Sequence, residues 1–147
     1  MTVALSGQEL ASRIEAKFPG SVVASGAGSL VVKPESVPAV RAYLKEDPSL
    51  KMDYFNYVTA VDYYSYFEVV YQLASLEHNH SVIIKTRTGD RENPAVPSVV
   101  GLWQGADFQE REIYDLMGIR FEGHPNLKRI FLWDGFPGYP LRKDFLS

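Results

Sequence analysis

Glu110, Glu112 and Asp115 are the residues of this chain whose types and spacing could best support acid–base chemistry. Glu112 and Asp115 are three positions apart, so they are neighbours on a helix. Crowded carboxylates can raise a carboxyl pKa toward a value useful for catalysis. However, Arg111 lies four positions before Asp115 and can pair with it, and the first turns of a helix stabilise charged carboxylates. We therefore expect structural capping, with a stand-alone enzyme using a carboxylate or His124 as the alternative.

The chain has three histidines and no cysteine. His78 and His80 flank one residue of an expected hairpin turn, and His124 is far along the sequence. Two imidazoles could share a face of a strand, but a zinc site needs three or four ligands. We expect solvated turn histidines and no metal site. The lack of cysteine also excludes thiolate nucleophiles and an iron–sulfur cluster held wholly by thiolates of this chain.

Aromatic residues are concentrated between positions 54 and 71. They are Tyr54, Phe55, Tyr57, Tyr63, Tyr64, Tyr66, Phe67 and Tyr71. A sheet core uses one face of each strand, so we expect about half of these rings in the core. The other half is expected at an interface, where tyrosine is enriched. A quinone or flavin pocket built from these rings is the alternative.

The acidic segment is expected to lie on a short helix. Asp107 is the expected N-cap, with Glu110 three residues later as the reciprocal half of a capping box. Gly118 is the expected stop, because glycine accepts the left-handed conformation that ends many helices. Residues 119–122 alternate as an extended segment does, and residues 123–126 are expected to form a tight turn.

The preceding residues predict an α+β fold. Amphipathic patterns indicate helices over Ser6–Phe18 and Ser36–Lys45, each with a serine cap. The expected strands are the short runs 22–24 and 30–32 and the longer runs Tyr54–Val61, Tyr66–Ser75 and Ser81–Thr88. Residues 89–97 are expected to be a loop. We expect a single domain with a mixed or antiparallel sheet of about five strands, helices on one face, and an extended irregular C-terminal arm.

The last part of the chain is expected to form that arm. Glycine and proline recur after residue 132, so this segment should be ordered mainly by lying on something else. We therefore expect an α+β domain over residues 1–118 and an arm over residues 119–147 that packs on a partner subunit. Residues 1–118 hold 10 Lys and Arg against 15 Asp and Glu, whereas residues 119–147 hold 5 against 3.

The overall charge and hydropathy narrow the function class. A net charge of −3 argues against a general nucleic-acid binder. No apolar run approaches the ~20 residues that a membrane helix needs, and no signal peptide is visible. Any association with a membrane is therefore expected to come through partners.

Several segments of this chain resemble one protein family. They are Glu110-Arg111-Glu112, Tyr114-Asp115, Gly118-Ile119, Gly123-His124-Pro125-Asn126-Leu127, Arg129-Ile130, the tail Gly138–Phe145 and the upstream runs Thr59–Tyr63 and Phe67–Tyr71. The family is the 30 kDa subunit, also called the C-type subunit, of proton-pumping NADH:quinone oxidoreductase (NDH-1, respiratory complex I).

The resemblance implies a cofactor-free subunit of the peripheral arm, with a role in assembly and rigidity. The implied partners are the large quinone-site subunit (the 49 kDa type) and iron–sulfur subunits, which would carry the iron–sulfur clusters, the quinone and NADH or another donor. The implied location is peripheral, on the cytoplasmic side of the inner membrane. Equivalent subunits of membrane-bound nickel–iron hydrogenases and of ferredoxin- or F420H2-linked relatives of complex I are the alternatives.

The resemblance also assigns roles to residues of this chain. It implies that Glu110, Arg111, Glu112, Asp115 and Gly118 build the helix and its exit, that Gly123, His124, Pro125 and Arg129 fix the arm, and that Leu141, Arg142, Lys143 and Asp144 lie along the neighbouring subunit. Among the last group, Arg142 is the candidate interface anchor.

Overall fold

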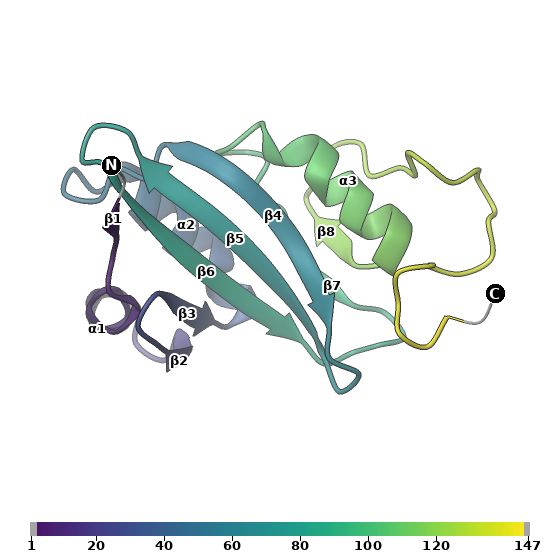
Figure 1. The fold of residues 1–147 in the computed structure, drawn as a ribbon, viewed down its shortest axis with the longest axis horizontal. Coiled ribbons are helices and arrows are strands. Elements are labelled where there is room, and N and C mark those ends of the chain that lie inside the picture. The colour runs from purple at the N-terminus through teal and green to yellow at the C-terminus, as the bar shows by residue number, and fades with distance from the viewer. Residues whose placement is uncertain (1–2, 146–147) are drawn as a thin grey trace.

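Three nine-residue strands form the centre of the main sheet in the computed structural model, which describes residues 3–145 (Figure 1). They are β4 (Tyr54–Asp62), β5 (Phe67–Ser75) and β6 (His80–Thr88), and neighbouring strands pair antiparallel. Every second residue along β5 and β6 points to the same face of the sheet, and on one face these residues are mostly apolar and belong to the core. The expected antiparallel meander is confirmed.

Shorter strands complete the main sheet and form a second one. β2 (Val22–Ser25) and β3 (Ser29–Val32) form a hairpin, and β3 and β1 (Val3–Ala4) both pair parallel with β6. The main sheet therefore has six strands, in the order β2-β3-β6-β5-β4 with β1 beside β6. β7 (Ala95–Pro97) pairs parallel with β8 (Arg120–Glu122) in a two-stranded sheet. Residues 89–97, which were expected to be a loop, therefore end in the strand β7, because β8 pairs with it from a distant part of the sequence.

Three helices pack against the main sheet. They are α1 (Gly7–Lys17), α2 (Val37–Glu46), which follows the 3-10 turn η1 (Pro34–Ser36), and α3 (Ala106–Met117). The Ser6 hydroxyl caps α1 as expected, accepting a hydrogen bond from the Glu9 backbone N–H at 3.3 Å. Ser36 makes no such bond, because the chain already turns through η1 before α2 begins.

The core lies between the helices and one face of the sheet. Phe67, Val69, Tyr71 and Leu73 of β5 are buried there with apolar residues of all three helices. Figure 1 shows α2 behind the sheet and α3 alongside the edge strand β4. This confirms the α+β arrangement. No helix within residues 3–145 is long and apolar enough to cross a membrane.

The C-terminal segment returns to the body of its own chain. The backbone N–H of Leu141 donates to the carbonyl of Leu116 at 2.9 Å, and that of Lys143 donates to the Asp62 carboxylate at 2.9 Å. The surface that orders this segment therefore includes α3 and the end of β4. The packing of the arm on a partner subunit stays a proposal.

Candidate functional site

Glu110 is the most deeply buried acid of α3 together with Asp115, and its side chain is directed into the protein. Its two carboxylate oxygens accept hydrogen bonds from the Ser98 hydroxyl at 2.6 Å and the Val99 backbone N–H at 2.9 Å. Burial raises the pKa of Glu110. The expected capping box is wrong: Gly105 occupies the N-cap position, Asp107 lies in the first turn, and Glu110 binds the loop before the helix.

Asp107 instead joins α3 to the turn that follows β8. His124 Nε2 lies 2.8 Å from Asp107 Oδ1, and its Nδ1 accepts a hydrogen bond from the Asn126 backbone N–H at 2.9 Å. The network therefore assigns the proton to Nε2. The His124 side chain is fully buried, so the expectation of a solvated turn histidine is wrong at this position. With both ring nitrogens bonded within the chain, His124 is not free to act as a base.

Asp115 attaches the arm to α3. Its Oδ2 accepts hydrogen bonds from three successive backbone N–H groups, those of Ile130, Phe131 and Leu132, at 3.0, 2.7 and 3.2 Å. The carboxylate is fully buried. The expected pairing with Arg111 does not form, because Arg111 Nε donates to the Lys128 carbonyl on the arm. Both charges therefore serve the junction between helix and arm.

Arg129 closes the next part of the arm into a loop. Its guanidinium donates to the carbonyls of Phe136 and Gly138 at 2.9 and 2.8 Å. It lies 4.8 Å from the centre of the Tyr139 ring, and its Nε is 3.5 Å from an Asp115 oxygen. A cation held between a carboxylate, two carbonyls and an aromatic ring gives this glycine- and proline-rich segment a defined path.

Gly118 ends α3 with a left-handed φ of 75°, as expected. A Cβ at this position would lie 2.7 Å from the Tyr139 ring and 2.8 Å from an Arg142 nitrogen, so the site also needs the absence of a side chain. Arg142 donates to the carbonyls of Met117 at 2.7 Å and Arg91 at 3.0 Å. These hydrogen bonds are made within the chain.

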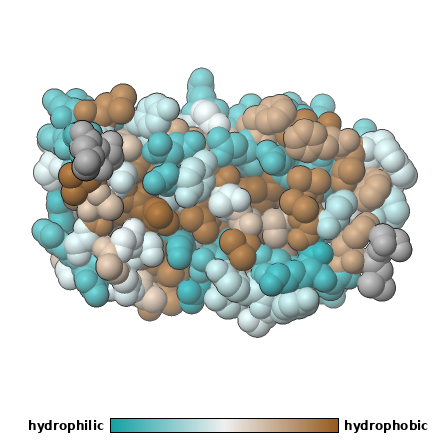
Figure 2. Space-filling model, in the orientation of Figure 1, coloured by the Kyte–Doolittle hydropathy of each residue, from teal (hydrophilic) through white to brown (hydrophobic). Residues whose placement is uncertain are grey.

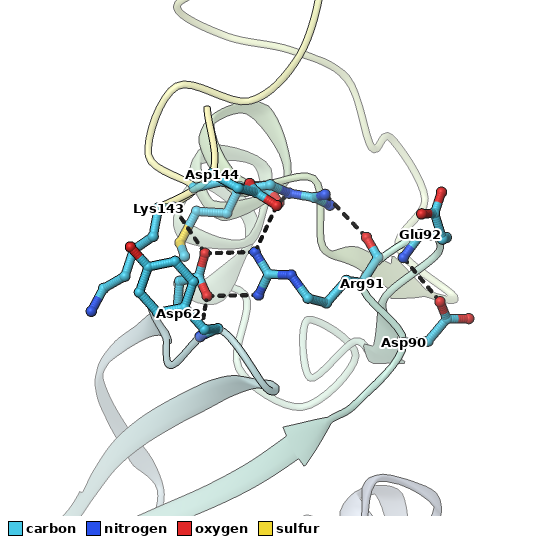
Figure 3. A network of polar contacts seen from close by, with 9 residues as sticks. Asp62, Asp90, Arg91, Glu92, Lys143 and Asp144 are labelled. Carbon is cyan, nitrogen blue, oxygen red and sulfur yellow. Dashed lines mark hydrogen bonds and ion pairs between the residues drawn. The ribbon is translucent and has the colours of Figure 1, made fainter. Parts of the chain in front are cut away.

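The end of the arm is held by an ionic network, which we call the Asp62 clasp: Asp62, Arg91, Lys143 and Asp144 (Figure 3). Arg91 binds both Asp62 oxygens, at 2.7 and 3.0 Å, and reaches Asp144 at 3.1 Å. Asp62 also accepts the backbone N–H groups of Tyr64 and Lys143. The hydrogen bond from Arg91 holds the pKa of Asp62 well below its usual range.

These contacts do not form a metal centre or an obvious reaction site. No group of three or more His, Asp or Glu side chains among residues 3–145 is placed to hold a metal ion. His78 and His80 lie with ring centres 5.5 Å apart, and each Nε2 is bonded to a backbone carbonyl. A cleft of about 670 Å³ beside α2 and β8 is lined by Arg41, Asp107 and Glu122 among others, but its Asp107 is bound to His124.

Comparison with known proteins decides the family. Residues 30–147 match the model of the family described as "Respiratory-chain NADH dehydrogenase, 30 Kd subunit". The chain belongs to this family. It is 45% identical over 135 residues to a C-type subunit of NADH-quinone oxidoreductase from Rhizobium meliloti (strain 1021), covering 87% of this chain and 73% of that protein. It is 38% identical over 149 residues to the C-type subunit from Roseiflexus sp. (strain RS-1), covering 97% and 85%.

Two solved structures share the fold of this 30 kDa family member. A trypsin-resistant fragment of Nqo5 has a TM-score of 0.66 and 30% identity, covering 82% of this chain and 98% of that one. A chain of the membrane-bound sulfane sulfur reductase, described as an archaeal respiratory membrane complex, has a TM-score of 0.72 and 26% identity, covering 94% and 84%. Since the second likeness covers 94% of this chain, it includes much of the C-terminal arm as well as the sheet.

In this member of the 30 kDa family, most of the family-motif residues meet at the junction between α3 and the arm. Glu110 is an exception because it binds the loop before α3, and Lys143 and Asp144 belong to the Asp62 clasp. Glu112 and Pro125 are exposed and make none of the contacts described above. Leu141 contributes its backbone to the junction while its side chain is exposed. Gly123 has a left-handed φ of 86°, which suits the turn that presents His124.

The centre of the clasp is not predicted by the sequence patterns. They place Asp62 only within a segment that resembles the family, and Arg91 within a polar loop. A signal exists for Asp62: it shares a face of β4 with the buried Val58 and the half-buried Ala60, so a charge there requires a partner. The same argument does not predict that this partner is Arg91, because Arg91 lies in a loop 29 residues away in the sequence.

Proposed function

We propose that this chain is a cofactor-free structural and assembly subunit of the peripheral arm of an NADH:quinone oxidoreductase. It supports the quinone-reducing module, and no electron-transfer step occurs on it. Family membership over residues 30–147 carries the proposal. The buried acids agree with it: Asp62, Glu110 and Asp115 are bound by backbone N–H groups, a hydroxyl or an arginine, and these bonds organise the chain.

The exposed aromatic side chains of the arm support the proposal that it binds a protein partner. Phe131 and Trp133 are 60% and 64% exposed, and Phe108 of α3 packs edge-on against Phe131 with ring centres 6.4 Å apart. Large exposed aromatic side chains grouped in this way are typical of protein interfaces. We propose that the exposed side chains of Phe108, Phe131, Trp133 and Leu141 pack on the large quinone-site subunit beside the iron–sulfur subunits.

The roles of the family-motif residues divide accordingly. Asp115, Gly118, His124 and Arg129 shape the junction from within the chain, as their contacts indicate. Glu110 holds the loop before α3. The partner then meets a surface that is already ordered, which lowers the entropy cost of association. Leu141 has a side chain that is 59% exposed, so it is the better candidate for direct contact than Arg142.

Affinity purification from the source cells tests the proposal. A tagged wild-type chain should recover a large assembly that contains a quinone-site subunit and iron–sulfur subunits. Trp133→Ala should weaken this binding by about 2 kcal/mol or more, as loss of an interface anchor does. Leu141→Ala should also weaken it, whereas Leu76→Ala, at an exposed leucine in the turn between β5 and β6, should not.

Two results would contradict the structural role. One is a wild-type chain that remains alone under gentle extraction, with no larger assembly recovered. The other is a bound chromophore in the ultraviolet–visible spectrum, or turnover by the isolated chain, which would favour the stand-alone enzyme.

The second candidate is the equivalent subunit of another respiratory membrane complex. The likeness to a chain of the membrane-bound sulfane sulfur reductase supports this candidate. That chain has the same fold, and its complex is described as a sulfane sulfur reductase and not as an NADH dehydrogenase. The identity of the large subunits that co-purify distinguishes the candidates.

We also propose a peripheral location on the cytoplasmic side of the inner membrane, held through partners. The chain should sediment with membranes and be released, together with its partners, by treatments that detach peripheral complexes. Protease added to inverted vesicles should reach it, and protease added to intact spheroplasts should not.

A further inference from the structure

The main sheet has a second face that the helices do not cover. Side chains on this face belong to the positions that alternate with the core residues, and pairing places them in cross-strand rows. The apolar side chains on this face are those of Val31, Tyr57, Val61, Val70 and Ile83, which we call the apolar stripe. Polar side chains lie between them in the rows: Lys85 between Val31 and Val70, Gln72 between Ile83 and Tyr57, and Glu68 opposite Val61. No helix within the described residues lies over it (Figure 1). Figure 2 shows hydrophobic residues crossing the middle of this face, between more polar margins.

The charges at one end of the stripe are unequal. Glu68 is buried in the face and is contacted by Arg87 at 2.9 Å and Lys85 at 3.8 Å. Arg87 also lies over the Tyr66 ring, 4.9 Å from its centre. One carboxylate therefore faces two cations, which leaves an excess positive charge beside the apolar stripe. Apolar residues next to tyrosine and arginine are the composition of an interface centre.

We propose that this open sheet face is a second docking surface, and that its occupant is an amphipathic helix of a partner subunit with carboxylates beside Lys85 and Arg87. The proposal rests on the assembly role proposed above and adds a surface to it. A helix is a usual cover for the apolar side chains of a sheet face, and its polar residues can meet the charged side chains beside them. Nine-residue strands at ~3.3 Å per residue span ~30 Å, the length of a helix of ~20 residues.

The charge pattern selects this occupant over a second copy of the chain. A second copy would bring its own Lys85 and Arg87, with its Glu68 already paired to them. Two positively charged faces would then meet, which costs free energy across an interface. A helix with an apolar stripe and terminal or flanking carboxylates matches both parts of the surface.

A matched pair of substitutions tests the surface in the full chain. Val61 on the stripe and Val23 on the outer strand β2 are both exposed valines, at 36% and 54%. Val61→Glu should reduce the partner subunits recovered with the tagged chain at least tenfold, because it puts a charge into the apolar contact and repels the acidic helix. Val23→Glu should leave recovery unchanged. Thermal unfolding of the purified variants checks that each is folded.

A cross-link identifies the occupant without a destabilising charge. With p-benzoylphenylalanine in place of Tyr57, irradiation of the assembled complex should link this position to one segment of a partner subunit, and that segment should be an acidic amphipathic helix by its sequence. A cross-link to a second copy, or to a segment without those features, overturns the inference.

The two proposals can fail separately. If the wild-type chain recovers no assembly, the assembly role is wrong and the docking surface falls with it. If the wild-type chain assembles and Val61→Glu assembles equally well, only the docking surface is wrong.

Discussion

Arg91 donates hydrogen bonds to both carboxylate oxygens of Asp62 at the point where β4 ends and the C-terminal arm returns to the sheet (Figure 3). The same Asp62 accepts the backbone N–H of Lys143, which is 81 positions later in the chain. One buried acid therefore joins three segments that are distant in sequence. The energetic consequences of this arrangement can be measured.

Removal of the Asp62 carboxylate should be costly and pH-dependent. Asp62→Ala leaves the half-buried Arg91 without its main partner, so at pH 7 the free energy of unfolding should fall by about 3 kcal/mol. The pKa of Asp62 is lowered in the folded chain from an ordinary 3.8. Its stabilisation is therefore present above about pH 4 and is lost as the pH falls through the folded pKa.

Urea unfolding between pH 7 and pH 3 measures both effects. The difference between wild type and Asp62→Ala should shrink below pH 4. Asp134→Ala, at an exposed acid of the arm, is the control and should change stability little at any pH. A difference that stays constant from pH 7 to pH 3 would contradict the assignment.

Glu110 should show the opposite dependence on pH. Burial raises the pKa of this carboxyl, so the folded chain holds the proton more tightly than the unfolded chain. The contribution of Glu110 to stability is therefore greatest below its unfolded pKa of about 4.5 and declines as the pH rises through the folded value. Glu110→Gln keeps an acceptor for the Val99 N–H without the charge, and it should be at least as stable as wild type at pH 7.

Glu110→Ala provides the contrast to that conservative change. It leaves the Ser98 hydroxyl and the Val99 N–H without their acceptor, which should cost about 2 kcal/mol. Thermal unfolding of both variants at pH 5 and pH 8 compares them. A Gln variant as unstable as the Ala variant would mean that the charge itself stabilises the fold.

Gly118 should not tolerate a side chain. Gly118→Ala places a Cβ 2.7 Å from the Tyr139 ring and adopts a left-handed φ, so it should destabilise the chain by about 2 kcal/mol or more. Gly101→Ala is the matched control, since a Cβ there meets nothing within 4 Å and its φ is not left-handed. Equal unfolding midpoints in denaturant for the two variants would contradict the close packing of the arm on α3.

Asp115 should control the local order of the arm. Asp115→Ala removes the acceptor shared by the N–H groups of residues 130–132, so their hydrogen exchange should accelerate at least tenfold. Glu112→Ala, at an exposed acid one turn earlier on α3, should leave this exchange unchanged. Protection of residues 130–132 that persists without Asp115 would show that another contact orders them.

The aromatic residues between positions 54 and 71 illustrate how far periodicity reaches. Phe67 and Tyr71 are buried in the core, and Phe55 and Tyr66 are partly buried. The other four are exposed, which matches the expected division into halves, although their role at an interface stays a prediction. Alternation along a strand determines which face a ring lies on, because successive side chains point to opposite faces. It does not determine what covers the outer face.

The sequence predicts which residues belong to the candidate site, but it does not predict which residues they contact. The family resemblance identifies Glu110, Asp115, His124 and Arg129, but the local patterns assign Glu110 to a capping box and His124 to solvent. Both assignments fail for the same reason. Each side chain turns toward a segment brought close by the fold, Ser98 and Val99 in one case and the start of α3 in the other.

The sequence by itself determined what depends on neighbours along the chain: the Ser6 cap of α1, the end of α3 at Gly118, the three long strands and the family. Only the tertiary structure decided that the arm returns to its own body and that Asp62, Arg91 and Lys143 meet. The physical reason is range: helix and strand patterns report interactions between residues a few positions apart. An ion pair between distant segments leaves no periodic trace, and its partners are chosen by how the sheet, α3 and the arm pack together.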